Sequence, residues 1–397
     1  MRLFHVVFLC LAVCAVACAQ DLSCTTDAAV VPTMRGDGEA EHLGDILLVC
    51  SGGTEGASSL INVTVALNTN LTSRIMNATT AESEATLLID DPLPGVVDTC
   101  NGFPYNGQVQ GKPGILAGQP GSGNLYLGRQ TSATSVTWTG VPFVEPGPSG
   151  ERFLRLTNLR GNAATVATQS GLTPVQATVS ASFALNNPTP YVGFASSTSF
   201  TFSGAITSPS TASLTFTEGF PSAFEPRILL TSTGTFARQD LPGEVYYSES
   251  QFTPCFGLTN CSTPPQSQIG FANSATLLQT QITGLGSGAA FLSVPNQVVE
   301  NLTADIREKL YLMSGGKPVT GPGSTLLTVS GGAVEVIYEV ASADASAFDQ
   351  FVITATLLGP TEAPMSFPAN TVFAGQLAPV NSTGTASASA PEPRFVP

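Results

Sequence analysis

The fold class is decided by one stretch, Ile61-Asn62-Val63-Thr64-Val65-Ala66-Leu67-Asn68, in which every second side chain is a large apolar one. A period of two is typical of a β-strand with one buried face and one wet face. Upstream, Asp45–Cys50 (DILLVC) is apolar on both faces, as a central strand would be. Downstream, Glu84–Asp91 (EATLLIDD) is a third strand candidate. We expect these three strands to form the core of a first domain.

The same alternation recurs along the rest of the chain. It is strongest at Val175–Leu185 (VQATVSASFAL), and Ser135–Val144 with Arg152–Arg160 is predicted to form a hairpin around a loop at 146–150. Leu302–Met313 is expected to be a helix capped by Thr303, and a short helical turn is expected at 342–349. Further strands are predicted at 124–127, 212–217, 227–231, 244–248, 275–283, 289–294, 325–330, 333–340 and 351–358.

Many short strands with turn residues between them predict an all-β protein built from two tandem immunoglobulin-like, or related, β-sandwich domains. The length of 397 residues is too great for one sandwich. We place the first domain at residues 20–161 and the second at 162–380. Residues 381–397 (NSTGTASASAPEPRFVP) form a low-complexity stretch that predicts a disordered C-terminal tail.

Composition limits the partners of this chain. Charged residues make up 11% of it, against about 25% in ordinary globular domains, so hydroxyl and amide groups must supply most of the wet surface. The formal net charge is −14, and Lys112, Lys309 and Lys317 are the only lysines. Nucleic-acid binding requires a basic face, so we expect no nucleic-acid partner.

The N-terminus has the pattern of a secretion signal. Arg2 precedes the apolar run Leu3–Val16, and Ala17-Cys18-Ala19 fits a cleavage site, so residues 1–19 are predicted to be a signal peptide. The alternative is a lipoprotein box that would acylate Cys18. No later apolar run is long enough to predict a membrane span. We expect a secreted protein, extracellular or at the cell surface, with the periplasm as the alternative.

Five cysteines follow the signal, and export permits disulfides. Cys24 with Cys50, and Cys255 with Cys261, are the pairings that we expect, although spacing alone does not fix connectivity. Cys100 would then stay unpaired and available for a link between two chains.

Four stretches together carry a resemblance: Glu41–Thr54, Ile61–Arg74, Phe153–Arg160 and Thr217–Arg227. With these stretches the chain resembles a group of uncharacterised, secreted, β-rich two-domain proteins of soil bacteria. The resemblance implies a bacterial, exported protein with two β domains, and it implies no activity.

Catalytic patterns are sparse. His42 is the only histidine after the signal, and no GxSxG motif accompanies it. Asp90-Asp91 is an acidic pair, but neighbouring strand residues point to opposite faces and do not converge on one glycosidic bond. Zinc is disfavoured because no CxxC pair occurs, and the tripeptide Arg35-Gly36-Asp37 is taken as a chance occurrence. No cofactor is expected. Weak calcium candidates are the acids that lie close together in sequence, Asp37, Glu39, Glu41 and Asp45.

Aromatic side chains are the remaining ligand candidates, because sugar-binding β-sandwiches stack exposed rings on sugar faces. They are Trp138, Tyr246 and Tyr247, with core packing as the simpler explanation for Trp138. The leading hypothesis is a non-enzymatic, exported structural or adhesion protein of the cell surface or extracellular matrix. It would self-associate through edge strands or Cys100. The alternatives are a carbohydrate-binding module with a polysaccharide partner and a carboxylate-dependent glycoside hydrolase.

Overall fold

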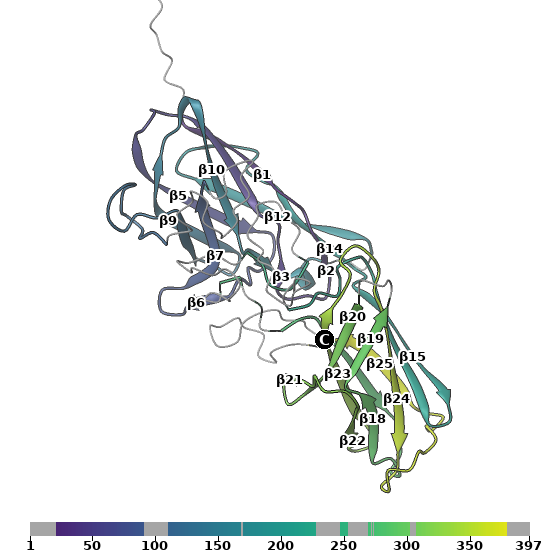
Figure 1. The fold of residues 1–397 in the computed structure, drawn as a ribbon. Helices are drawn as coiled ribbons and strands as arrows, with labels where there is room; N and C mark the ends of the chain where they lie inside the picture. The colour runs from purple at the N-terminus through teal and green to yellow at the C-terminus, as the bar shows by residue number, and fades with distance from the viewer. Residues whose placement is uncertain are drawn as a thin grey trace, which may run out of the picture.

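The computed structural model describes residues 21–90, 110–167, 170–227, 247–252, 269–270, 272, 274–301 and 307–378. This part of the chain is all-β, as the sequence predicts, and it contains no α-helix. The strands gather around two separate hydrophobic cores. In Figure 1 the half that begins with the purple strands and the half that ends with the yellow strands lie end to end and give an elongated molecule.

A twelve-stranded sheet surrounds the first core and curls on itself as a half-barrel, so that the edge strand β13 contacts β12. Most neighbours in this sheet are antiparallel, and the two exceptions are β1 with β13 and β14 with β2. In order across the sheet the strands are β13 (Ala184–Asn186), β1 (Ser23–Ala28), β4 (Ile46–Gly52), β10 (Gly147–Thr157), β7 (Glu82–Ile89), β8 (Leu125–Gln130), β9 (Ser135–Val144), β5 (Ser58–Leu67), β12 (Leu172–Ala181), β14 (Tyr191–Ser196) and β2 (Thr33–Arg35), with β6 (Ile75–Asn77) beside β7.

The alternating stretch that opens the sequence analysis is the inner part of β5. Ile61, Val63, Val65 and Leu67 are all buried and face the core. Strand β5 pairs with β9 on one side and β12 on the other, which makes it an interior strand. A two-stranded sheet of β3 (Glu41–His42) and β11 (Arg160–Gly161), and the short 3-10 helix η1 (Ala163–Thr165), complete this half.

Two sheets share the second core in a sandwich-like arrangement. One sheet contains β15 (Phe200–Ser208), β16 (Thr211–Glu218), β24 (Gln350–Leu358), β18 (Phe291–Pro295) and β22 (Ser324–Thr328), in that order. The other contains β19 (Gln297–Asn301), β20 (Arg307–Ser314), β23 (Val334–Ser342), β17 (Leu277–Thr283) and β25 (Val372–Leu377), with β21 (Lys317–Pro318) beside β20.

The predicted boundary after Gly161 falls inside the first core. Strand β12 pairs with β5 in the register Ala177↔Leu67, and the first core extends to Ala195. The second core begins at Ala212. The alternation at Val175–Leu185 suggested a new domain, but its hydrogen-bonding partner lies far upstream, and a local pattern does not reveal a distant partner.

Three local predictions were wrong. Strand β9 pairs with β5 and β8, whereas β10 pairs with β4 and β7, so these two strands form no hairpin. The expected helix at Leu302–Met313 is a strand over its described part, β20, in which buried Leu310 and Leu312 alternate with half-buried Lys309 and Tyr311. The helical turn expected at 342–349 is absent, because Ser342 is the last residue of β23 and 343–349 contains a turn and no helix.

Candidate functional site: a buried charge network between the two β cores

A short segment of chain between β16 and β17 of the second core packs against the first domain. We define the junction segment as Tyr247–Phe252, which precedes β17 of the second core. Its Phe252 is fully buried and packs against Leu88 and Leu125, side chains of the first sheet. The Arg155 guanidinium lies 4.5 Å from the Phe252 ring centroid, within the range of a cation–π contact. The junction segment therefore inserts into the first β domain.

Arg35, the last residue of β2, is the hub of the junction and is only 2% exposed. Its Nη2 donates to Glu41 Oε1 at 2.8 Å, within the first domain, and its Nη1 lies 2.6 Å from Glu249 Oε1 of the junction segment. Nη1 also donates to Thr276 Oγ1 at 2.7 Å and to the Ala223 carbonyl at 3.3 Å. One planar guanidinium thus binds groups from both halves of the chain.

Arg160 extends the network from β11. Its Nη2 donates to the Glu249 carbonyl at 2.5 Å, and its Nε lies 3.6 Å from Glu84. Glu84 also pairs with Arg74 at 3.0 Å and accepts a hydrogen bond from the Gly270 N–H at 3.2 Å. Both carboxylate oxygens of Glu84 are therefore used, one of them across the junction.

His42 supplies the remaining ionisable group of the network. Its Nε2 lies 3.2 Å from Glu225 Oε2, again across the two halves of the chain. Burial alone would lower the pKa of His42, but the Glu225 carboxylate outweighs this effect and raises the pKa. The three arginines face four carboxylates (Glu41, Glu84, Glu225 and Glu249), so a protonated His42 would balance the charge.

The two carboxylates that share Arg35 are not equivalent. Burial would raise the pKa of Glu249, but Arg35, with His42 and Arg160, outweighs burial and lowers it. Burial raises the pKa of Glu41, and the nearby Glu249 raises it further. Together they outweigh Arg35, which lowers it. Glu249 is therefore the firmly ionised partner of Arg35, and Glu41 is the one that accepts a proton more readily.

Three buried acids, Glu218, Glu308 and Asp349, lie in the second β domain. The Glu218 carboxylate accepts the Phe224 N–H at 2.6 Å and the Asp349 N–H at 2.9 Å. Burial raises the pKa of Glu218 to about 8. Burial also raises the pKa of Glu308 to about 8 and that of Asp349 to about 6, and these two acids interact with each other. Such carboxyl groups favour the folded state most when they are protonated.

The four acids considered as calcium ligands are placed in other surroundings, and three of them contact other side chains. Glu41 pairs with Arg35, and Asp45 pairs with the buried Arg155 at 2.6 Å. Asp37 accepts a hydrogen bond from the Ser199 hydroxyl, and Glu39 is half-buried. In the described part of the chain, no three His, Cys, Asp or Glu side chains are grouped to hold a metal ion.

Two of the three aromatic candidates lie in the described part of the chain, and one is buried while the other is exposed. Trp138 is 1% exposed, and its Nε1 donates to the Tyr126 carbonyl at 3.1 Å, so it is a core residue. Tyr247 is 43% exposed, at the start of the junction segment. Tyr246 lies outside the described residues. Asp90 pairs with Arg152 at 2.5 Å, and Asp91 also lies outside the described residues.

The pairing of Cys24 with Cys50 is confirmed as a disulfide between directly opposite residues of β1 and β4. Cys100, Cys255 and Cys261 lie outside the described residues, as do the signal segment 1–19 and the tail 381–397.

The junction network itself was missed by the sequence analysis. Two signals could have found it. Arginine is scarce in this chain, yet Arg155 and Arg160 stand in the apolar strand sequence Phe153–Arg160, where burial demands a partner. Arg35 directly follows the apolar Met34 in the sequence, so the tripeptide Arg35-Gly36-Asp37 need not be a surface motif.

None of the described helical segments is long and apolar enough to cross a membrane. No protein-family model matches the chain, and no curated protein sequence matches it. The geometry of the junction and of the sheets therefore carries the functional argument.

Proposed function

We propose that this chain is an exported, non-enzymatic structural or adhesion protein in which two β domains act as one stiff unit. The observation that carries this proposal is the junction network. Arg35, Arg160 and His42 of the first domain contact Glu249 and Glu225 of the second half of the chain at distances from 2.5 to 3.2 Å. Interfaces between mobile domains are usually polar and wet, whereas this one contains fully buried charges.

Buried ion pairs of this kind favour one arrangement over all others. Moving either domain would separate charges in a medium of low dielectric constant, and each unpaired buried charge is strongly unfavourable. The Cys24–Cys50 disulfide also fits an exported protein, because such bonds persist in oxidising compartments. A stiff, elongated unit suits a spacer or matrix component better than a protein that must close around a substrate.

Self-association would complete a structural role, and β22 is the strand best suited to it. Its outer edge is unpaired among the described strands, and its sequence, Ser324-Thr-Leu-Leu-Thr328, carries no charge or proline. The other sheet edges are short, as in β2 and β13, covered, as in β15 beside β25, or charged, as in β19 with its Glu300. An uncharged and uncovered edge is a template for pairing.

The register of β22 indicates how two copies would pair. Val329 donates to the Ala290 carbonyl, so alternate residues bond to β18, and the backbone groups of Ser324, Leu326 and Thr328 point to the free edge. Two β22 strands related by a two-fold axis through Leu326 would pair antiparallel. The Leu326 side chain, which is 39% exposed, would then pack against Leu326 of the second copy.

Size-exclusion chromatography with light scattering on the chain from residue 20 tests this function. We expect a dimer that persists in reductant and is lost in Leu326→Lys, because a two-fold contact between two β22 edges is closed. Thr354→Lys, an exposed change on the interior strand β24 of the same sheet, is the control and should leave assembly intact. Assembly that disappears in reductant would assign it to cysteine, and a monomer at every concentration would overturn the self-associating structural role.

The two alternatives have less support. The carbohydrate-binding hypothesis based on an aromatic platform loses Trp138, which is buried. The glycoside-hydrolase hypothesis needs two carboxyl groups across an open cleft. Glu308 and Asp349 are instead fully buried, and Asp90 is neutralised by Arg152.

A further inference from the structure

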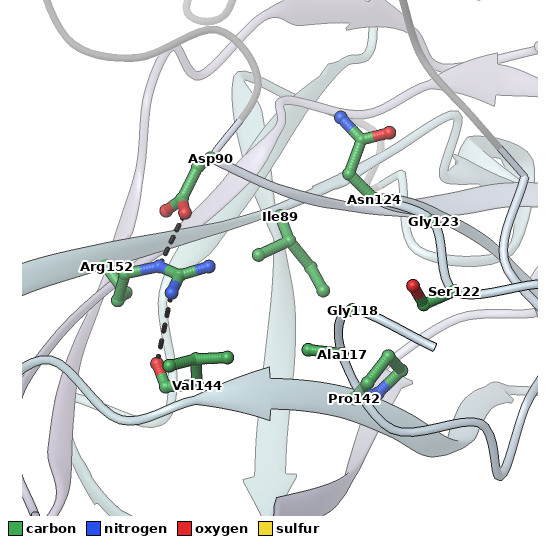
Figure 2. A pocket seen from close by; sticks show the side chains of 10 residues that line it. All are labelled: Ile89, Asp90, Ala117, Gly118, Ser122, Gly123, Asn124, Pro142, Val144 and Arg152. Carbon is green, nitrogen blue, oxygen red and sulfur yellow. Dashed lines mark hydrogen bonds and ion pairs between the residues drawn. The ribbon is translucent and has the colours of Figure 1, made fainter. Parts of the chain in front are cut away.

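A cavity of about 320 Å³ opens in the first β domain, and none of its lining residues belongs to the junction network. It lies between the end of β7, the loop 117–124, β9 and β10 (Figure 2). Ala117, Gly118 and Gly123 form one wall, and their small size leaves the space open. Its volume is at the lower end of the range of about 300–1,000 Å³ that small-molecule sites occupy.

An ion pair stands at one side of this cavity and is fixed in position. Asp90 Oδ2 lies 2.5 Å from Arg152 Nε, and Asp90 Oδ1 accepts the Phe153 N–H at 2.9 Å. Arg152 Nη1 donates to the Val144 carbonyl at 3.2 Å, and the guanidinium lies 5.7 Å from the centroid of the Phe143 ring. Side chains held by several contacts at once are already ordered before a ligand arrives.

The same pair keeps polar atoms available to a ligand. About a quarter of each side chain is exposed, 27% for Arg152 and 22% for Asp90. In Figure 2 the third guanidinium nitrogen, Nη2, points toward Ile89 in the middle of the cavity, and Ser122 stands on the opposite side. Ile89, Pro142 and Val144 supply apolar surface between these polar groups.

The charges select the class of ligand. A carboxylate or phosphate would be attracted by Arg152 but repelled by the adjacent Asp90 and by a chain of net charge −14. A cation would be attracted by Asp90 but repelled by Arg152. A hydroxyl group both donates and accepts hydrogen bonds, so neighbouring hydroxyls can bind the guanidinium and the carboxylate together. The apolar wall can then contact C–H groups.

We propose that this cavity binds an uncharged, hydroxyl-rich ligand of the size of a mono- or disaccharide, with Arg152 as donor and Asp90 as acceptor. The site differs from the aromatic platform expected from the sequence, because none of the described residues that line it is aromatic. It does not depend on the structural function proposed above. Because the described lining offers no ring that stacks on a sugar, we expect weak binding, in roughly the millimolar range.

Ligand-observed NMR on the full secreted chain tests this proposal, with glucose, N-acetylglucosamine, cellobiose and chitobiose as neutral probes and glucuronate as a charged one. We expect at least one neutral probe to bind more tightly than glucuronate. Ala117→Trp should fill the cavity without touching the ion pair and abolish binding, and Asp90→Asn should weaken it at least about fivefold.

Two matched controls accompany these variants. Ala133→Trp places the same side chain on an exposed bend, and Asp27→Asn makes the same change at an exposed position of β1, so both variants should bind like the unchanged chain. The proposal is overturned if no neutral probe binds at millimolar concentration, if Ala117→Trp binds normally while folded, or if glucuronate binds most tightly.

Discussion

Replacing Arg35 by methionine should destabilise the whole protein. Methionine keeps much of the aliphatic length of arginine but removes the charge that Glu41 and Glu249 share, and it removes the hydrogen bonds to Thr276 and the Ala223 carbonyl. Deleting one partner of a buried ion pair costs about 3–5 kcal/mol. This is a large part of the roughly 5–15 kcal/mol that holds a typical protein folded.

Urea unfolding followed by tryptophan fluorescence measures this loss directly, because Trp138 is the only tryptophan and is buried in the first core. We expect a loss of about 3–5 kcal/mol in the free energy of unfolding, seen as a lower midpoint concentration of urea. Arg35→Met combined with Glu249→Leu should recover part of the loss, since one orphaned carboxylate is removed with its partner.

Arg129→Met is the control, because Arg129 is exposed on β8 and its Nε donates only to the Thr80 carbonyl. Its change in unfolding free energy should stay within about 0.5 kcal/mol. A loss below about 1 kcal/mol for Arg35→Met would refute the reasoning, because it would mean that the buried carboxylates do not need this arginine.

Three further predictions concern the junction, the disulfide and the acidic group. Phe252→Ala should cost about 3–5 kcal/mol by leaving a cavity beside Leu88 and Leu125, measured by urea unfolding; a cost like that of a surface change would contradict its buried position. Cys24→Ala with Cys50→Ala should cost about 3 kcal/mol, since the bond closes a sequence separation of 26 residues; an unchanged unfolding midpoint would argue against the bond. Stability should be greatest in mild acid. The pKa values of His42, Glu218, Asp349 and Glu308 are raised in the folded state, so the stabilisation that these groups give is present at low pH and is lost as pH rises toward about 8. The pKa of Glu249 is lowered, so its stabilisation is lost only as pH falls below about 4.5. Glu308→Gln should flatten the decline of Tm between pH 5 and 8, and an equally steep decline in this variant would exclude Glu308 as its source.

Local patterns predicted the β class and many strands of this protein. Period-two alternation predicted β5, β12 and β16, because each of these strands alternates buried with more exposed side chains over much of its length. The register of Cys24 and Cys50 explains why that pair was also predictable, since a disulfide needs opposed residues and few partners were available.

Long-range pairing could not be predicted in the same way. The neighbours of β9 and β10 are strands distant in sequence, and nothing in a strand's own alternation says which edge it will meet. The helix expected at Leu302–Met313 had favourable residues, but burial of Leu310 and Leu312 in the second core overrode that propensity.

The junction network was hidden for a related reason. Arg35, His42, Arg160 and Glu249 are spread over more than two hundred positions, and only the fold brings them together. The strength of their ion pairs depends on burial, which is a property of the folded chain. The cavity at Asp90 and Arg152 was hidden in the same way, because the sequence suggested only an acidic pair at Asp90-Asp91.

Hydrogen exchange at increasing urea concentration tests most directly whether the two β domains form one unit. Peptides from β9 report on the first core, and peptides from β24 report on the second. If the junction network couples the cores, the slowest amides of both strands should open with the same free energy and the same urea dependence. Opening of one core at distinctly lower free energy, while the other stays protected, would contradict the account.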